Sequence, residues 1–184
     1  MSWNNQESKE ENALGLSNVF VNNVAKKVAP GLFDCVLSCD ELVQKYHTLF
    51  LKSSCAIVNL ALSTQRIGHF CLLYVNLERG KIEIFDSLSI FFQDPNVVKY
   101  LQKLKRNYPY YQVIYSPFPI QHPVKSNFCS IFCLAYLAHI VQRRSTLLGR
   151  RPTMDDFYLM FDKEDKFGRN DQIALRYLLD FILG

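Results

Sequence analysis

The stretch between residues 120 and 141 constrains the fold more than any other part of the chain. Its sequence, IQHPVKSNFCSIFCLAYLAHIV, begins as a polar loop and continues into an apolar helix with Cys129 in the first turn. Apolar residues recur every three to four positions and also fill most of the remaining faces, which is typical of a helix buried on nearly all sides. Ser126 or Asn127 would cap its start, because either side chain accepts a hydrogen bond from a free N–H group.

Cys129 is the residue in this helix with potential chemistry. The positive end of a helix dipole favours a thiolate over a thiol, so a cysteine in the first turn is a candidate nucleophile. The alternative is an inert core residue, because a free cysteine packs like a small hydrophobic side chain. The helix alone does not decide between these hypotheses, and the decision depends on what the rest of the chain brings to Cys129.

Length and composition favour one globular domain without membrane or metal chemistry. We expect a flexible polar tail at residues 1–12 and a single domain over 13–184. The tail contains no apolar secretory segment and no apolar run is long enough to span a membrane, so the six cysteines are expected to be reduced. Their spacing does not match zinc ligands, and we expect neither a metal nor a required cofactor.

Periodicity and capping residues predict an α+β fold, with a central mixed or antiparallel sheet flanked by helices. The helix that begins near Cys129 is expected to cross the core of this arrangement. The predicted strands lie at 54–62, 68–77, 81–86 and 110–115, and the predicted helices lie at 13–28, 39–46, 94–107, 129–141, 153–161 and 171–183.

Two of the predicted strands, 68–77 and 81–86, form an antiparallel hairpin because only a short turn separates them. With the turn centred near residue 78 or 79, His69 lies opposite a position about two residues past Asp86, within diagonal reach. Either residue alone has an ordinary structural explanation at the end of a strand. Their meeting at the open end of one hairpin is more specific than either.

These residues together match the needs of a cysteine nucleophile. A thiolate needs a base, the base needs a partner that fixes its tautomer, and a tetrahedral intermediate needs donors for its oxyanion. His69 and Asp86 would fill the first two roles. Gln121, on the proline-bounded loop before the helix, would supply an amide donor beside the Cys129 backbone N–H.

The motifs around these residues resemble a known family. They are Gly68-His69-Phe70 at the start of one strand, Phe85-Asp86-Ser87-Leu88 at the end of the next, Cys55-Ala56-Ile57-Val58-Asn59, and Gln121-x-Pro123 leading into Ser126-Asn127-Phe128-Cys129. Over roughly residues 30–145 the chain resembles the ubiquitin-like-protein protease clan of cysteine peptidases, and within it the adenain-like maturation proteases of adenoviruses. The resemblance implies that Cys129, His69, Asp86 and Gln121 are the catalytic residues.

The chain departs from that family at several positions. Phe70 stands in place of the usual tryptophan, Ser130 in place of a glycine, and Asp86 in place of the glutamate of adenain-like proteases. Gln121 precedes Cys129 by eight residues, one or two more than usual. No cysteine lies between Cys71 and Cys129, so the disulfide that tethers an activating viral peptide to these proteases has no counterpart here.

The resemblance implies a thiol endopeptidase that cleaves viral capsid or core precursors at glycine-containing sites during virion maturation. It implies a monomer located in the virion and the host nucleus, or alternatively in the host cytoplasm, with DNA or a viral peptide as a potential activator. A deubiquitinase or ubiquitin-like-protein protease is the second hypothesis, although the single tryptophan, Trp3, lies in the polar tail.

A non-enzymatic DNA- or capsid-binding protein with an inert Cys129 is the third hypothesis. The net charge of +4 gives it mild support. Basic residues that would contact a nucleic acid fall in two clusters, although a solvated helix face is the commoner explanation of such a cluster. The candidates are Lys99, Lys103, Arg106, Arg143, Arg144, Arg150 and Arg151.

Overall fold

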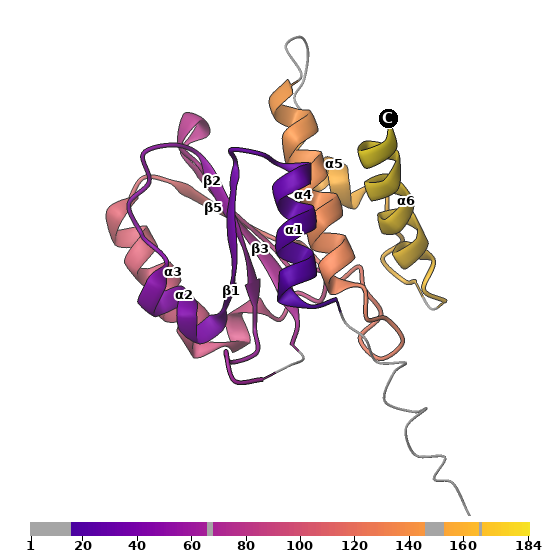
Figure 1. The fold of residues 1–184 in the computed structure, drawn as a ribbon, viewed down its shortest axis with the longest axis horizontal. Coiled ribbons are helices and arrows are strands. Elements are labelled where there is room, and N and C mark those ends of the chain that lie inside the picture. Colours follow the sequence, from indigo (N-terminus) through magenta and orange to yellow (C-terminus); the bar gives the residue numbers. More distant parts are fainter. Residues whose placement is uncertain (1–15, 66–67, 146–152, 166) are drawn as a thin grey trace, which may run out of the picture.

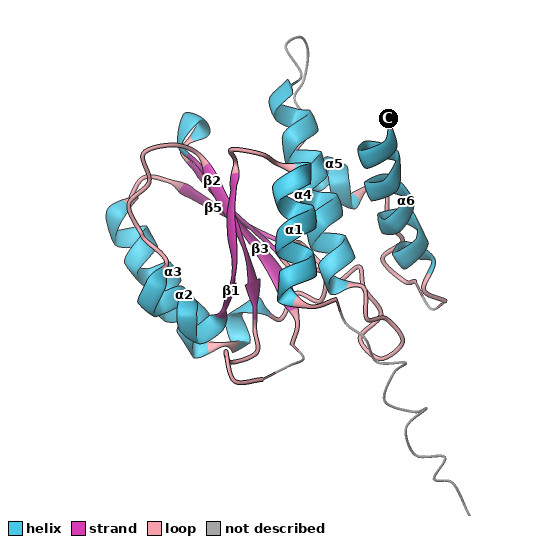
Figure 2. Ribbon diagram, viewed as in Figure 1, coloured by secondary structure: helices cyan, strands magenta, loops and turns pink. Residues whose placement is uncertain are grey.

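A five-stranded mixed sheet forms the centre of the computed structural model, which describes residues 16–65, 68–145, 153–165 and 167–184 (Figures 1 and 2). Strands follow one another across the sheet in chain order, with parallel pairs at the two edges and antiparallel pairs in the middle. The predicted fold class is therefore confirmed. The strands are β1 (Phe33–Ser38), β2 (Ser54–Asn59), β3 (Phe70–Asn76), β4 (Lys81–Phe85) and β5 (Gln112–Tyr115).

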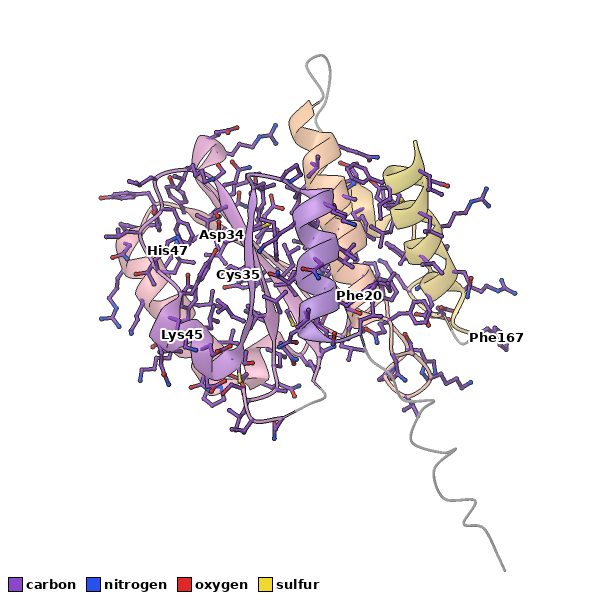
Figure 3. All side chains as sticks on the ribbon, viewed as in Figure 1. Phe20, Asp34, Cys35, Lys45, His47 and Phe167 are labelled. Atoms are coloured by element: carbon purple, nitrogen blue, oxygen red, sulfur yellow. The ribbon has the colours of Figure 1, made fainter. Side chains whose placement is uncertain are left out.

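Helices cover both faces of the sheet (Figure 1). Figure 3 shows Lys45 and His47 in the layer of α2 and α3, and Phe20 on α1 in the opposite layer. The helices are α1 (Asn18–Val28), α2 (Cys39–Lys45), α3 (Pro95–Asn107), α4 (Cys129–Ser145), α5 (Met154–Tyr158) and α6 (Arg169–Leu183), with 3-10 turns η2 (Leu77–Arg79) and η3 (Phe91–Gln93).

Two hydrophobic cores lie on the two faces of the sheet, because successive side chains of a strand point to opposite faces. One core contains α1, α4, α5 and α6, and the other contains α2 and α3. The α4 side chains are almost completely buried from Phe132 to Ile140, as the sequence predicts. In β3, Phe70, Leu72 and Tyr74 belong to the first core, and Cys71, Leu73 and Val75 belong to the second.

The β3–β4 hairpin has the predicted register. Leu72 pairs with Phe85 and Asn76 pairs with Lys81, and Gly80 completes the turn in the left-handed conformation with φ of 60°. Extending this register by three residues from the Leu72–Phe85 pair places His69 opposite position 88. His69 and the residues after Asp86 therefore meet at the open end of the hairpin.

Some elements differ from the prediction. Strand β1 was not expected, and it pairs in parallel with β2 at the edge of the sheet. Helix α4 begins at Cys129, so its N-cap position falls on Phe128 instead of Ser126 or Asn127. It extends to Ser145, so Arg143 and Arg144 lie in its last turns and not in a loop. The predicted polar tail at 1–12 lies outside the described residues.

Across the described ranges, no helix combines the length and apolar character that crossing a bilayer requires.

Candidate active site

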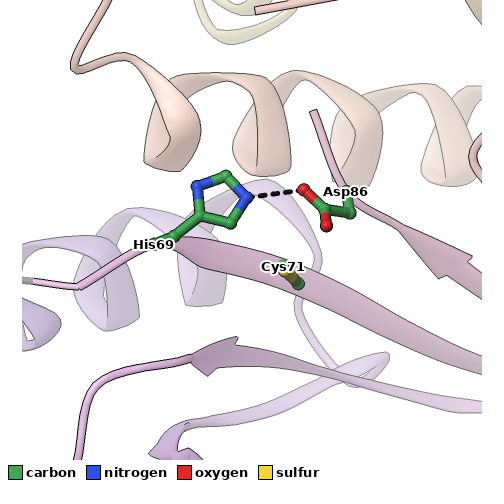
Figure 4. A group of neighbouring side chains, drawn as sticks. All are labelled: His69, Cys71 and Asp86. Carbon is green, nitrogen blue, oxygen red and sulfur yellow. Dashed lines mark hydrogen bonds and ion pairs between the residues drawn. The ribbon is translucent and has the colours of Figure 1, made fainter. Parts of the chain in front are cut away.

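His69 and Asp86 form a hydrogen-bonded pair at the open end of the β3–β4 hairpin (Figure 4). The Nε2 atom of His69 lies 2.5 Å from Oδ1 of Asp86, and the Asp86 side chain is 2% exposed. This contact leaves Nδ1 of the imidazole as the nitrogen that faces away from Asp86. Asp86 thereby fixes both the orientation and the tautomer of the base that the sequence predicts.

The Asp86 carboxylate is held by the loop that follows it. Oδ1 also accepts the N–H of Leu88 at 2.8 Å, and Oδ2 accepts the N–H groups of Ile90 and Phe91 at 2.6 and 2.7 Å. Ser89 adopts a left-handed conformation with φ of 57° in the middle of this loop. Burial alone would raise the pKa of Asp86, but its hydrogen bonds to His69, Leu88 and Ile90 and the charge of His69 lower it. Asp86 therefore remains a carboxylate.

Cys129 occupies the first position of α4 and lies next to His69. The side chain is almost buried, with 9% exposure, and its backbone N–H belongs to the first helical turn, where N–H groups have no partner within the helix. Burial tends to lower the pKa of His69, but hydrogen bonds and charges from Asp86 and Cys129 outweigh it and raise the pKa to about 9. Because Asp86 uses Nε2, Nδ1 is the ring nitrogen left for the Cys129 sulfur.

Two further thiols surround the site without a role in the reaction. Cys133 donates to the Phe70 carbonyl at 3.3 Å, and burial raises the pKa of both Cys133 and Cys71 well above the ordinary value. His69, Cys71 and Asp86 offer nitrogen, sulfur and oxygen atoms within 4.8 Å of one another, a spacing that a metal site also requires (Figure 4). Because Asp86 already bonds His69 and three N–H groups and Cys71 stays protonated, we assign His69 to proton transfer, Asp86 to its orientation and Cys71 to packing.

Gln121 packs against Ser87, the residue that follows Asp86, and a buried network fixes its amide. Its Oε1 atom accepts the Ser87 hydroxyl at 2.6 Å, and its Nε2 donates to the Ser126 carbonyl at 2.9 Å. A side-chain amide has two N–H donors, so one remains for a ligand. The eight-residue interval to Cys129 is taken up by a turn that the Ser126 N–H closes on the His122 carbonyl at 3.2 Å.

The start of helix α6 holds the loop that carries Gln121 through side-chain hydrogen bonds. Asp171 accepts the Ser126 hydroxyl at 2.7 Å, and the fully buried Asn170 donates to the Ile120 carbonyl at 2.8 Å. Burial raises the pKa of Asp171, although the Ser126 hydroxyl opposes the effect. The residues on either side of Gln121 are therefore tied to the start of α6.

The sequence predicts His69, Asp86, Gln121 and Cys129 as site residues. The structure brings His69, Asp86 and Cys129 together, and it bonds Gln121 to Ser87, the residue after Asp86. Sequence reasoning missed the roles of Ser87, Ser126, Asn170 and Asp171, which act through hydrogen bonds between distant segments. Ser87 could have been suspected because it follows Asp86 directly. No local pattern marks Asn170, since its partners Ile120 and Asp162 lie in other loops.

The predicted basic residues are not all brought together. Lys99, Lys103 and Arg106 are exposed on α3, which covers one face of the sheet, whereas α4 with Arg143 and Arg144 covers the other. The side chains of Arg143 and Arg144, and the whole of Arg150 and Arg151, lie outside the described residues. Among the described side chains, the basic candidates therefore lie on one exposed face of α3.

We expect Gln121→Ala to lower kcat about 100-fold with little change in KM, because an oxyanion donor acts mainly in the transition state. Steady-state kinetics and thermal melting of the variant check this prediction. Gln112→Ala, a truncation of an exposed glutamine on β5, is the matched control and should retain native kcat. An unchanged kcat in a folded Gln121→Ala protein would exclude Gln121 as a donor.

Comparisons with known proteins place the fold but not the family. No family model matches the chain, and no curated protein matches its sequence. AvrA, in a structure with IP6 and CoA, is 19% identical over 97% of this chain and 72% of its own, with a TM-score of 0.51. The SUMO protease Ulp1 is 18% identical over 89% and 75%, with a TM-score of 0.44.

The effector protein ChlaDUB of Chlamydia abortus is a further structural neighbour. It is 20% identical over 71% of this chain and 57% of its own, with a TM-score of 0.41. At these identities the likeness concerns the fold. The chemistry of this chain is argued from its own residues.

Proposed function

We propose that this chain is a cysteine peptidase that hydrolyses peptide bonds through a thioester on Cys129. The observation that carries the proposal is the position of His69, which bonds the buried Asp86 carboxylate through Nε2 and interacts with Cys129 at the start of α4. A thiol at a helix N-terminus beside a cationic imidazole is the arrangement that activates a cysteine.

The reaction follows from this arrangement. The Cys129 thiolate attacks the scissile carbonyl, and the oxyanion binds the Cys129 backbone N–H and the remaining N–H of Gln121. Protonated His69 then donates its Nδ1 proton to the leaving amine, which leaves a thioester on Cys129. Neutral His69 next takes a proton from water, the resulting hydroxide attacks the thioester, and the acid product leaves as Cys129 returns to its starting state.

The substrates proposed first are viral structural precursors cleaved at glycine-containing sites. The support for this proposal is the sequence resemblance to adenain-like proteases in the motifs around His69, Asp86, Gln121 and Cys129. Location in the virion and host nucleus belongs to the same proposal. Stimulation by DNA is a weaker part of it and rests on the exposed Lys99, Lys103 and Arg106 of α3.

A ubiquitin-like-protein protease is the second candidate, because the same motifs resemble the wider clan, in which an aspartate such as Asp86 orients the histidine. Ubiquitin and SUMO carrying a C-terminal vinyl sulfone distinguish the candidates. Labelling of Cys129 by one of these probes favours the second candidate, and cleavage of glycine-containing peptides without any labelling favours the first.

The pH dependence of alkylation tests whether Cys129 is activated at all. The pKa of about 9 keeps His69 cationic at neutral pH, so iodoacetamide should modify Cys129 rapidly even below pH 7. Cys129 should lose this rate advantage over an ordinary thiol as the pH passes about 9, because the His69 ring loses its proton there. Asp86→Asn removes a group that raises the pKa of His69. In this variant, Cys129 should therefore lose its rate advantage at a lower pH.

Cys35 provides an internal control for the alkylation experiment. It is partly exposed, and burial together with Asp34 raises its pKa to about 11, so it should react slowly throughout the neutral range. Mass spectrometry of the modified peptides separates the two sites. If Cys129 reacted no faster than Cys35 at pH 6, the inert-cysteine hypothesis would replace the peptidase proposal.

A further inference from the structure

A groove of about 660 Å³ opens beside Gln121. Three loops line it, and two of them belong to the candidate active site described above. Leu88 and Ile90 come from the loop after Asp86, residues 119–123 form the loop that carries Gln121, and residues 162–165 form the loop before α6. The groove therefore starts at the oxyanion donor.

The position of the first loop gives the groove a direction relative to the scissile bond. The N–H groups of Leu88 and Ile90 bond the carboxylate of Asp86, which lies behind His69. Since His69 protonates the leaving amine, the substrate segment that follows the scissile bond departs on the His69 side of Cys129. The groove shares Leu88 and Ile90 with the loop that bonds Asp86, and from this shared loop we assign the groove to the side of the leaving-group segment.

The rim of the groove carries negative charge. Asp162 and Glu164 are exposed, and the Glu164 carboxylate has no partner among the residues that the structure describes. One oxygen of Asp162 accepts the Glu164 N–H at 2.9 Å, and the other is open to a ligand. Asp165 is less available to a ligand, because its carboxylate accepts the N–H groups of Phe167 and Asn170. The Lys163 ammonium lies 4.6 Å from the centre of the Phe118 ring. Below this rim, Leu88, Ile90, Pro119, Ile120 and Pro123 give the groove an apolar lining.

The shape of the groove is fixed by the protein, because hydrogen bonds of the buried Asn170 join two of its loops. Its amide nitrogen donates to the Ile120 carbonyl at 2.8 Å and to the Asp162 carbonyl at 2.7 Å, and its oxygen accepts the Asp162 N–H at 3.0 Å. The acidic rim is thus held at a fixed position relative to Gln121.

We propose that this groove binds the segment of a protein substrate that follows the scissile bond, and that Asp162 and Glu164 select segments carrying lysine or arginine. The inference rests on the peptidase function proposed above and adds a substrate class to it. The apolar lining accommodates the aliphatic stems of these side chains while their charged ends meet the rim.

Binding to the Cys129→Ala protein tests the groove without any need for turnover. The probes are fluorescein-labelled Gly-Gly-Lys-Leu-Lys-Leu and its acidic counterpart Gly-Gly-Glu-Leu-Glu-Leu, measured by fluorescence anisotropy. We expect the basic peptide to bind about five- to tenfold more tightly at low salt, which is the gain in affinity that two exposed ion pairs provide. This difference in affinity should shrink as salt is added.

Charge-neutralising variants locate the effect. Asp162→Asn combined with Glu164→Gln should remove the preference for the basic peptide. Asp155→Asn combined with Asp180→Asn changes the net charge equally at two exposed sites that do not line the groove, and should preserve the preference. Equal affinity for both peptides, or a preference that survives neutralisation of the rim, would overturn the proposal.

Cleavage mapping then tests the direction. The native chain should cut a chymotryptic peptide library at sites where lysine or arginine is enriched after the scissile bond, and the rim variant should lose this enrichment. Enrichment before the bond would overturn the assigned direction. Absence of all cleavage would count against the peptidase function, while the binding experiment would still decide the groove.

Discussion

Cys129→Ala is expected to abolish turnover of every peptide that the native chain cleaves, a loss of about 10⁴-fold or more. No thioester forms without the sulfur, and neither the oxyanion donors nor His69 can replace a nucleophile. His69→Ala should lose nearly as much, because both proton transfers pass through its Nδ1 atom. Asp86→Ala should lose less, because Asp86 orients and charges the ring but does not touch the substrate.

Cys133→Ala is the matched control for this prediction. Cys133 lies one turn further along α4, is completely buried, and donates to the Phe70 carbonyl. Its truncation removes one buried sulfur from the same helix and should leave kcat within about tenfold of native, since any effect acts through packing. Turnover that persists in Cys129→Ala, measured with a substrate the native chain cleaves, would rule out Cys129 as the nucleophile.

Gly68→Ala should impair both stability and activity, although the substitution adds only one methyl group. A Cβ atom at position 68 would lie 2.7 Å from the backbone nitrogen of Ala61 and closer still to Oδ1 of Asn59 and Cβ of Ala61. The neighbouring His69 carbonyl accepts the Leu60 N–H at 2.8 Å, so relieving the clash moves the residue that carries the base.

The cost of Gly68→Ala is expected to be about 2–3 kcal/mol in the free energy of unfolding, as for other overpacked interiors. A displacement of His69 by about 1 Å would lower kcat by about 100-fold. Urea denaturation and steady-state kinetics measure the two effects. Gly31→Ala is the control, because nothing lies within 4 Å of its Cβ position and only its φ of 76° opposes the substitution.

A second substitution tests the steric explanation directly. Asn59→Ala removes the closest atom that the new methyl group would meet, so the double variant should recover part of the stability lost in Gly68→Ala. Because Asn59 also accepts the Ala61 N–H, its single substitution has a cost that must be measured separately. If the two costs simply add, the close approach at Gly68 is not what positions His69.

Local patterns carry the parts of this fold that the sequence predicts well. The β3–β4 register follows from a short turn and two apolar runs, and it brings His69 beside Asp86. The burial of α4 follows from apolar residues on nearly all its faces. Strand β1 escapes prediction because it is a short edge strand whose Asp34 interrupts the apolar pattern. The structure shows that Asp34 accepts hydroxyl groups of Tyr46 and Ser54, which lie elsewhere in the chain.

The support of the site is harder to predict than its reacting groups. Cysteine, histidine, aspartate and glutamine suggest their roles by chemistry and spacing, whereas a buried asparagine has many structural uses. Asn170 is separated by 50 residues from Ile120, and nothing near it in the sequence indicates that contact. Only the packing of α6 against α4 brings the two segments together.

The two carbonyl groups held by Asn170 have a kinetic consequence. One belongs to the residue before Gln121 and the other to Asp162 on the rim of the groove, so a single side chain couples the two loops. A substrate that engages the rim therefore restricts the motion of the donor that faces the oxyanion. Interactions remote from the bond being broken then contribute to the rate of the chemical step as well as to affinity. In this chain, the preference for basic segments would therefore appear in kcat as well as in the affinity for the substrate.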